Sequence, residues 1–143
     1  MNARELRIGN YVKCLDDVIA VEYVDKLLIK GVYHRDAIYN TSVQVKHCKP
    51  IPLTEELLLK FGFKKVVYAS DKEGYGTEYN LKLSDDIYLN YLDDFSLGIY
   101  ADETRRNNDF AVIPATKMVK YVHQLQNLIF ALTGKEYEEM FLL

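Results

Sequence analysis

The residues of this chain that could do chemistry are three histidines, two cysteines and several acidic pairs. His34, His47 and His123, together with Cys14 and Cys48, could in principle hold a zinc ion. None of them shows a C-x₂-C or H-x₃-H spacing, and the neighbours His47 and Cys48 would point to opposite faces of a strand. A Cys–His nucleophilic pair would need a proximity that no local motif indicates. We therefore predict no catalytic residues, no metal site and no bound cofactor.

The acidic pairs are Asp85-Asp86, Asp93-Asp94 and Asp102-Glu103. Carboxylate clusters can bind a divalent cation or perform acid–base catalysis. Consecutive turns of an antiparallel meander lie at opposite ends, however, and the two pairs that would share an end stand roughly 10 Å apart. Gly74 and Gly76 resemble a phosphate loop, but a strand pattern follows them where a helix is needed. We interpret all of these residues as turn residues.

Five other side chains could form an interaction surface. His123 and Asn127 lie one turn apart on a predicted C-terminal helix, with Lys120 nearby, and could hold a partner; the alternative is a solvated polar stripe. Tyr88 and Tyr100 point outward from a predicted sheet, where they could fill a partner's pockets, stack on bases or pack across strands. Adding one residue of the apolar tail, the candidate interaction surface is Tyr88, Tyr100, Lys120, His123, Asn127 and Phe141.

The first half of the chain, through residue 49, alternates in strand fashion. We expect strands at about 11–14, 18–24, 27–33 and 42–46, joined by tight turns. Short strands with such connections predict a small curved β-sheet, either open or closed in part into a barrel. Pro50-Ile51-Pro52 ends this sheet, and a short helix at about 55–61 follows between a Thr54 cap and Gly62.

In the second half we expect a strand near 66–69 and then a meander of three or four strands, whose segments near 79–84, 87–92, 96–101 and 109–113 alternate with period two. The inward face of this meander reads Leu81, Leu83, Ile87, Leu89, Leu97, Ile99, Phe110 and Val112. A second helix, capped by Thr116 and running to about Leu132, carries one apolar stripe: Met118, Val122, Leu125, Ile129 and Leu132. The predicted fold is therefore α+β, with an N-terminal curved sheet, a short helix and an antiparallel meander packed by the C-terminal helix. We expect one domain over 1–143, with a β-rich subregion 1–49 and a second subregion 50–143.

Composition narrows the functional classes. Of 143 residues, 49% are hydrophobic and 27% charged, which is the balance of a globular protein. The net charge is −3 and the 18 basic residues are scattered, which argues against binding to the phosphate backbone of a nucleic acid. No apolar run has the length of a signal peptide or a membrane span, so we expect a cytoplasmic protein. A Cys14–Cys48 disulfide would be unusual in that reducing compartment, and the sequence leaves open whether the two cysteines are near each other.

Three segments together resemble one protein family. They are Leu6-Arg7-Ile8-Gly9-Asn10, then Pro52-Leu53-Thr54-Glu55-Glu56 with Leu58-Leu59-Lys60-Phe61-Gly62-Phe63, and finally Tyr121-Val122-His123-Gln124-Leu125-Gln126-Asn127-Leu128 with Phe130-Ala131-Leu132-Thr133-Gly134. They are similar to small proteins of uncharacterised activity encoded in Bacteroidales phages, prophages and mobile elements. The resemblance implies a phage-related accessory protein inside a bacterial cell, and it carries no catalytic residue. Gly9-Asn10-Tyr11-Val12 is also similar to the start of SH3-like barrels.

These observations lead to ranked hypotheses. The first is a non-enzymatic accessory protein that acts as a protein-interaction module, binding a protein partner or itself, with no membrane partner. The alternative is a nucleic-acid-associated accessory protein of a mobile element. An enzyme with a nonstandard site would need a deep pocket that gathers His123, Asn127 and an acidic residue.

Overall fold

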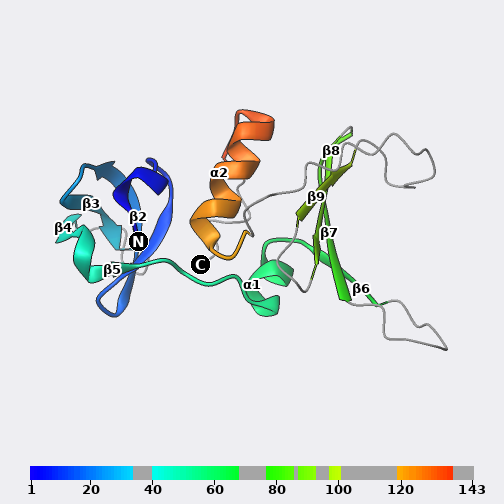
Figure 1. The fold of residues 1–143 in the computed structure, drawn as a ribbon, viewed down its shortest axis with the longest axis horizontal. Coiled ribbons are helices and arrows are strands. Elements are labelled where there is room, and N and C mark those ends of the chain that lie inside the picture. Colours follow the sequence, from blue (N-terminus) through cyan, green and yellow to red (C-terminus); the bar gives the residue numbers. More distant parts are fainter. Residues whose placement is uncertain (34–39, 68–76, 86, 93–96, 101–118, 137–143) are drawn as a thin grey trace. The chain divides into compact units, whose positions relative to one another are not determined.

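The structure is a computed structural model that describes residues 1–33, 40–67, 77–85, 87–92, 97–100 and 119–136 (Figure 1). Its contacts divide the chain into two compact units, Met1–Leu53 with Lys120–Leu143, and Thr54–Val119. The α+β fold class is confirmed. The expected boundary after residue 49 lies close to the end of the first segment, whereas the C-terminal helix groups with the N-terminal sheet. That the chain is one folding domain stays a prediction.

A five-stranded antiparallel sheet forms the body of the first unit. Its strands are β1 (Tyr11–Cys14), β2 (Asp17–Val24), β3 (Leu28–Tyr33), β4 (Asn40–Gln44) and β5 (Cys48–Lys49). Two 3₁₀ turns accompany them: η1 (Ala3–Glu5) before β1, and η2 (Val45–His47) between β4 and β5. The strand order is β4-β3-β2-β1-β5, and Figure 1 shows the sheet, blue to cyan, curled on itself. The curled sheet encloses one apolar core, made of Leu6, Val12, Cys14, Ile19, Val21, Ile29, Val45 and Cys48. This arrangement confirms the predicted small curved sheet, and its likeness to SH3-like barrels stays a prediction.

Two backbone positions shape this sheet. Gly31 pairs with Val21, and a Cβ placed on it would lie 2.0 Å from the carbonyl oxygen of Ala20, so only glycine fits there. Leu15, in the tight turn between β1 and β2, has a φ of 57° and an exposed side chain. The left-handed region is unfavourable for leucine, so this turn carries a small conformational cost.

The strand expected at 42–46 is corrected by the structure. The strand ends at Gln44, and Val45–His47 turns as η2 before the two-residue strand β5. The turn forms because the N–H of Val45 donates to the carbonyl of Leu27 (2.9 Å) and the N–H of Cys48 donates to the carbonyl of Val45. Strand β5, which the sequence pattern did not indicate, pairs with β1 at the edge of the sheet.

The C-terminal helix α2 (Val122–Thr133) begins later than expected. Thr116 and Met118 lie outside the described residues, but residues 119–121 are extended rather than helical. They are held so by backbone bonds to 51–53: Leu53 N–H donates to Lys120 O (2.8 Å), and Val122 N–H donates to Ile51 O (2.9 Å). The predicted apolar stripe is buried at Val122, Leu125 and Ile129, and Gly134, with φ 69°, ends the helix.

The second unit pairs a short helix with a four-stranded sheet. Helix α1 (Glu55–Lys60) has the predicted ends: Thr54 Oγ1 accepts from Leu57 N–H (3.3 Å), and Gly62 adopts φ 84°. The N–H of Phe63 then folds back onto Leu58 O (3.0 Å), as the predicted C-cap requires. The sheet has the order β6-β7-β8-β9, and its strands are β6 (Lys64–Val67), β7 (Thr77–Ser84), β8 (Ile87–Leu92) and β9 (Leu97–Tyr100).

The predicted inward face of this sheet is confirmed at Leu81 and Leu89, whereas Leu83 and Ile87 are half-buried and Asn90, expected to face outward, is buried. Leu81 and Leu89 are buried, and Glu55 ties α1 to the sheet by accepting from Lys65 Nζ (2.7 Å) and Tyr79 Oη (2.8 Å). These two donors lower the pKa of the Glu55 carboxyl. The strand expected at 109–113 lies outside the described residues.

Candidate functional site

The helix face that carries His123 and Asn127 is not a solvated polar stripe, which was the alternative to a partner-binding surface. His123 and Gln126 are buried, and Gln126 bonds to the backbone of the N-terminal segment. Its Oε1 accepts from Tyr11 N–H (2.9 Å) and its Nε2 donates to Gly9 O (3.1 Å). Because these bonds satisfy backbone groups before and at the start of β1, this face fixes α2 onto the N-terminal sheet.

Asn127 joins the same polar contact. Its Oδ1 accepts from Asn10 Nδ2 (2.9 Å), and its Nδ2 donates to Glu5 O (2.8 Å). Asn10 is fully buried and in turn accepts from the N–H of Arg7 (2.9 Å). Asn127 therefore contacts the chain itself in this structure, and its predicted role in binding a partner stays a prediction.

His123 is enclosed and has an unusual environment. Its exposed fraction is 0%, and neither ring nitrogen has a hydrogen-bond partner in the described part of the chain. Glu5 Oε2 lies 3.7 Å from Nε2, which is beyond hydrogen-bonding distance, and the ring stacks on Tyr121 with centroids 5.8 Å apart. Burial lowers the pKa of His123, and the nearby Glu5 carboxylate partly offsets this effect. The enclosed surroundings of the ring therefore disfavour its protonated form.

An ion pair adds to the contact between the N-terminal segment and α2, just beyond the end of this helix. The guanidinium of Arg7 bonds both carboxylate oxygens of Glu136, and it lies over the ring of Phe130, 4.1 Å from the centroid. Burial, with the Glu136 charge second, raises the pKa of Tyr11 to about 12. All these groups hold the first unit together.

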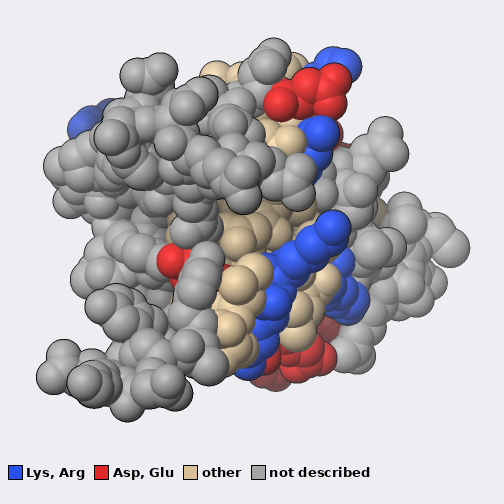
Figure 2. All heavy atoms as spheres, turned by 90° about the vertical axis from the view of Figure 1, so that its right-hand side faces the viewer, with Lys and Arg blue, Asp and Glu red and all other residues tan. Residues whose placement is uncertain are grey.

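The predicted tyrosine face lies on the second sheet. Tyr88 is half-buried, with Lys82 Nζ 5.6 Å from its ring centroid, and Lys82 also pairs with Asp85 (3.0 Å). The backbone of Tyr100 pairs with Tyr88, but its side chain and all of Phe141 lie outside the described residues. Figure 2, which views the side drawn at the right of Figure 1, shows basic and acidic side chains near one another among its coloured residues.

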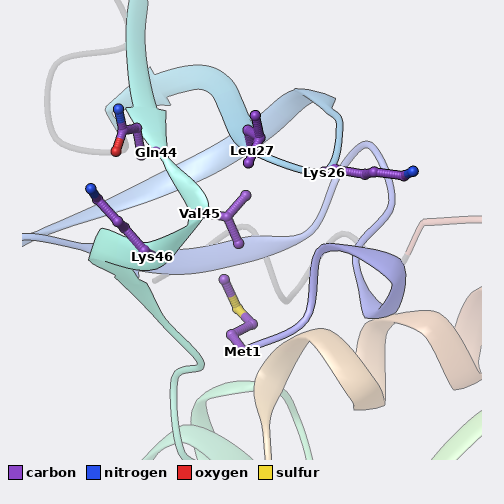
Figure 3. Close-up of a pocket in the computed structure, with 6 residues that line it drawn as sticks. All are labelled: Met1, Lys26, Leu27, Gln44, Val45 and Lys46. Atoms are coloured by element: carbon purple, nitrogen blue, oxygen red, sulfur yellow. The ribbon is translucent and has the colours of Figure 1, made fainter.

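A groove on the N-terminal sheet is a site that the sequence did not indicate. It is an open hollow of about 400 Å³ where the β2–β3 turn meets the end of β4, lined by Met1, Lys26, Leu27, Gln44, Val45 and Lys46. Figure 3 shows Val45 between Met1 and Leu27, with the two lysine side chains extending to opposite sides. We call these six residues the lysine-flanked groove. Leu27 is 76% exposed, so the apolar part of the groove is open to a partner.

Backbone bonds give the groove a fixed shape. Asp25 Oδ1 accepts from the N–H groups of Leu27 (2.7 Å) and Leu28 (2.8 Å), which holds the turn that presents Leu27. These two N–H groups lower the pKa of Asp25. Val45 N–H then donates to Leu27 O (2.9 Å), so η2 is bound to the same turn. A partner segment that binds the groove would therefore find its shape already fixed by these hydrogen bonds.

The charges of the groove are of one sign. Lys26 and Lys46 are exposed, and neither forms an ion pair with any residue that the structure describes. The nearest carboxylate in sequence, Asp25, is engaged by two backbone amides and by Tyr23 Oη (3.1 Å). An apolar floor between two ammonium groups suits an apolar side chain flanked by carboxylates.

The two cysteines belong to the same apolar core as Val45 of the groove. Cys14 and Cys48 face each other in the β1–β5 register and form a disulfide, with their Cα atoms 4.0 Å apart. Their proximity was left open by the sequence, because the turn that brings Cys48 opposite β1 was not foreseen. A disulfide is rare in a reducing cytoplasm, and the cytoplasmic location stays a prediction.

Two further features of the described part of the chain concern metal binding and membrane spanning. No group of three or more histidine, cysteine or acidic side chains lies close enough there to hold a metal ion. None of the helices in those residues has the length and apolar character needed to cross a membrane. Comparison with protein-family models, curated proteins and solved structures gives no match for this chain.

Proposed function

We propose that this chain is a non-enzymatic protein-interaction module whose lysine-flanked groove binds an extended acidic segment of a partner protein. The observation that carries the proposal is the exposed apolar group of Leu27, beside Val45, between Lys26 and Lys46. The segment would place one apolar side chain against Leu27 and Val45 and a carboxylate near each lysine. The resemblance to phage and prophage proteins supports an accessory role in a bacterial cell, as part of the same proposal.

The contacts predict a weak and transient complex. Burying one aliphatic side chain contributes about 1.5–3 kcal/mol, and each exposed ion pair contributes about 0.2–1 kcal/mol. Together these contributions amount to about 2–5 kcal/mol of binding free energy, which corresponds to a Kd of about 0.2 mM at the tightest and tens of millimolar at the weakest. Such affinity suits a module that acts beside other contacts or in several copies.

The test uses a fluorescein-labelled peptide with two leucines between paired glutamates. We expect its fluorescence anisotropy to rise as the protein is titrated to about 1 mM. The charge-reversal variant K26E/K46E should weaken binding at least about tenfold, because two weak attractions become repulsions. A peptide with lysines in place of the glutamates should show no binding.

The matched control is K13E/K49E. Lys13 and Lys49 are exposed, face each other across β1 and β5, and lie outside the groove, so this variant makes the same change in net charge. It should bind the acidic peptide as the wild type does. Equal losses in both variants, or no binding by the wild type, would refute the proposed site.

A nucleic-acid-associated role is the second candidate, favoured by Lys82 above the ring of Tyr88 on the second sheet. An aromatic ring beside a lysine can stack on a base and contact a phosphate. It predicts binding of single-stranded DNA or RNA that weakens steeply with salt and is lost in Tyr88→Ala. Absence of such binding at low ionic strength would remove this candidate.

A further inference from the structure

The Cys14–Cys48 disulfide occupies a position from which it can control the lysine-flanked groove. Strand β5 consists of Cys48 and Lys49 alone and lies at the edge of the sheet. Its ladder to β1 contains two residue pairs, one of which is the disulfide pair itself. A strand this short is held weakly by its backbone bonds, so the covalent bond is the main restraint on this edge.

Two residues of the groove belong to the turn that leads directly into this restrained edge. Val45 and Lys46 belong to η2, which runs to His47 and continues into Cys48. At its start η2 is bound to the β2–β3 turn by the Val45–Leu27 hydrogen bond. At its end it is held by the disulfide and by the long bond from Leu15 N–H to His47 O (3.3 Å). Breaking the disulfide therefore frees the end of η2 while its start stays attached.

We propose that the Cys14–Cys48 disulfide is a redox clamp: the oxidised protein holds η2 so that the groove binds its acidic segment, and reduction releases it. This inference rests on the proposed function of the groove. In the reduction, a dithiol supplies two electrons and two protons; the S–S bond breaks to two thiols, and the dithiol becomes a disulfide. The groove is then complete only where the bond can form or persist, which would link binding to the redox state of the compartment.

Burial of the bond sets how the clamp opens. Cys14 and Cys48 are 1% and 4% exposed, so an attacking thiolate reaches the sulfur atoms through local opening of β5 rather than at the folded surface. Opening of an edge strand of two residues needs little disruption of the rest of the sheet. We therefore expect reduction by dithiothreitol under native conditions, without denaturant.

The experiment follows two readouts on ¹⁵N-labelled full-length protein, before and after dithiothreitol, with thiol content measured by Ellman's reagent. The first is the amide spectrum without any ligand, in which Val45, Lys46 and Lys49 should shift while Ile29 and Val21 stay in place. The second is anisotropy of the acidic leucine peptide, whose affinity should fall about tenfold, as expected if one molecule in ten keeps a competent groove. The variant C14A/C48A should match the reduced protein and not respond to dithiothreitol.

The outcomes separate the clamp from the proposed function. If both redox forms bind the peptide equally, the clamp is refuted and the groove's function stands. If the η2 amides do not shift when the thiols appear, the clamp is refuted, and peptide binding by the oxidised form alone decides the groove's function. If the η2 amides shift but neither form binds the peptide, the groove's function is refuted. If the whole sheet loses its dispersed signals on reduction, or the bond resists native reduction, the local clamp is also refuted.

Discussion

Replacing Gln126 with leucine should show how strongly α2 is fixed to the N-terminal sheet. The amide of Gln126 is buried and provides an acceptor for Tyr11 N–H (2.9 Å) and a donor to Gly9 O (3.1 Å). Leucine has a similar volume but can make neither bond. Each buried polar group deprived of its partner costs about 1–3 kcal/mol, so we expect a loss of about 3 kcal/mol in the free energy of unfolding.

This loss is measured by urea unfolding followed by circular dichroism, and it corresponds to a fall in Tm of about 10 °C for a chain of this size. The matched control is Gln44→Leu, which makes the same chemical change at an exposed position and should lie within about 0.5 kcal/mol of the wild type. If Gln126→Leu also lies within that margin, the buried contact between α2 and β1 is not as described.

Three further changes test other parts of the fold. Because burial lowers the pKa of His123 below 6.5, its stabilising effect is complete above that pH and is lost as the pH falls towards the lowered value. Urea unfolding should therefore show a loss of stability from pH 7.5 to 5.5 that is smaller in His123→Phe, and equal losses would contradict the argument. Gly31→Ala should cost about 3 kcal/mol or more by the same assay, since its Cβ would meet Ala20 O; a neutral result would contradict the close approach. Leu15→Asn should raise the free energy of unfolding by about 0.5–1 kcal/mol, because asparagine tolerates the left-handed region, and a destabilised variant would contradict the turn geometry.

Local sequence patterns predicted the elements whose causes are local. Helix α1 followed from the Thr54 cap and Gly62, since each acts within one turn of its own position. The inward face of the second sheet followed from period-two alternation, and Leu81 and Leu89 are buried as expected.

Features that depend on distant partners could not be read in this way. The start of α2 was placed too early because residues 119–121 are extended by pairing with 51–53, which no local pattern records. The turn η2 looked like strand because Ser42-Val43-Gln44-Val45 alternates, while the bond from Val45 to Leu27 that turns it comes from another hairpin. The burial of His123 and the internal bonds of Asn127 were missed because the residues they lie against, Glu5 and Asn10, are more than 110 positions away in the sequence.

The groove itself was missed for the same reason. Its residues come from three separate segments: Met1, the turn at Lys26 and Leu27, and the end of β4 with η2. In the sequence Lys26 reads as part of a turn and Leu27 as the start of a strand. A leucine directly after the turn residues Asp25 and Lys26 was the one available sign that an apolar side chain would be exposed there.

The most direct test of the interaction proposal is a map of where the acidic peptide binds. In ¹⁵N–¹H spectra of the oxidised protein titrated with the unlabelled acidic leucine peptide, we expect saturable shifts at Leu27, Val45 and Lys46. The same titration should leave Lys82 and Tyr88 on the second sheet in place. Shifts confined to the second sheet, or spread without saturation over all exposed lysines, would contradict a docking site at the lysine-flanked groove.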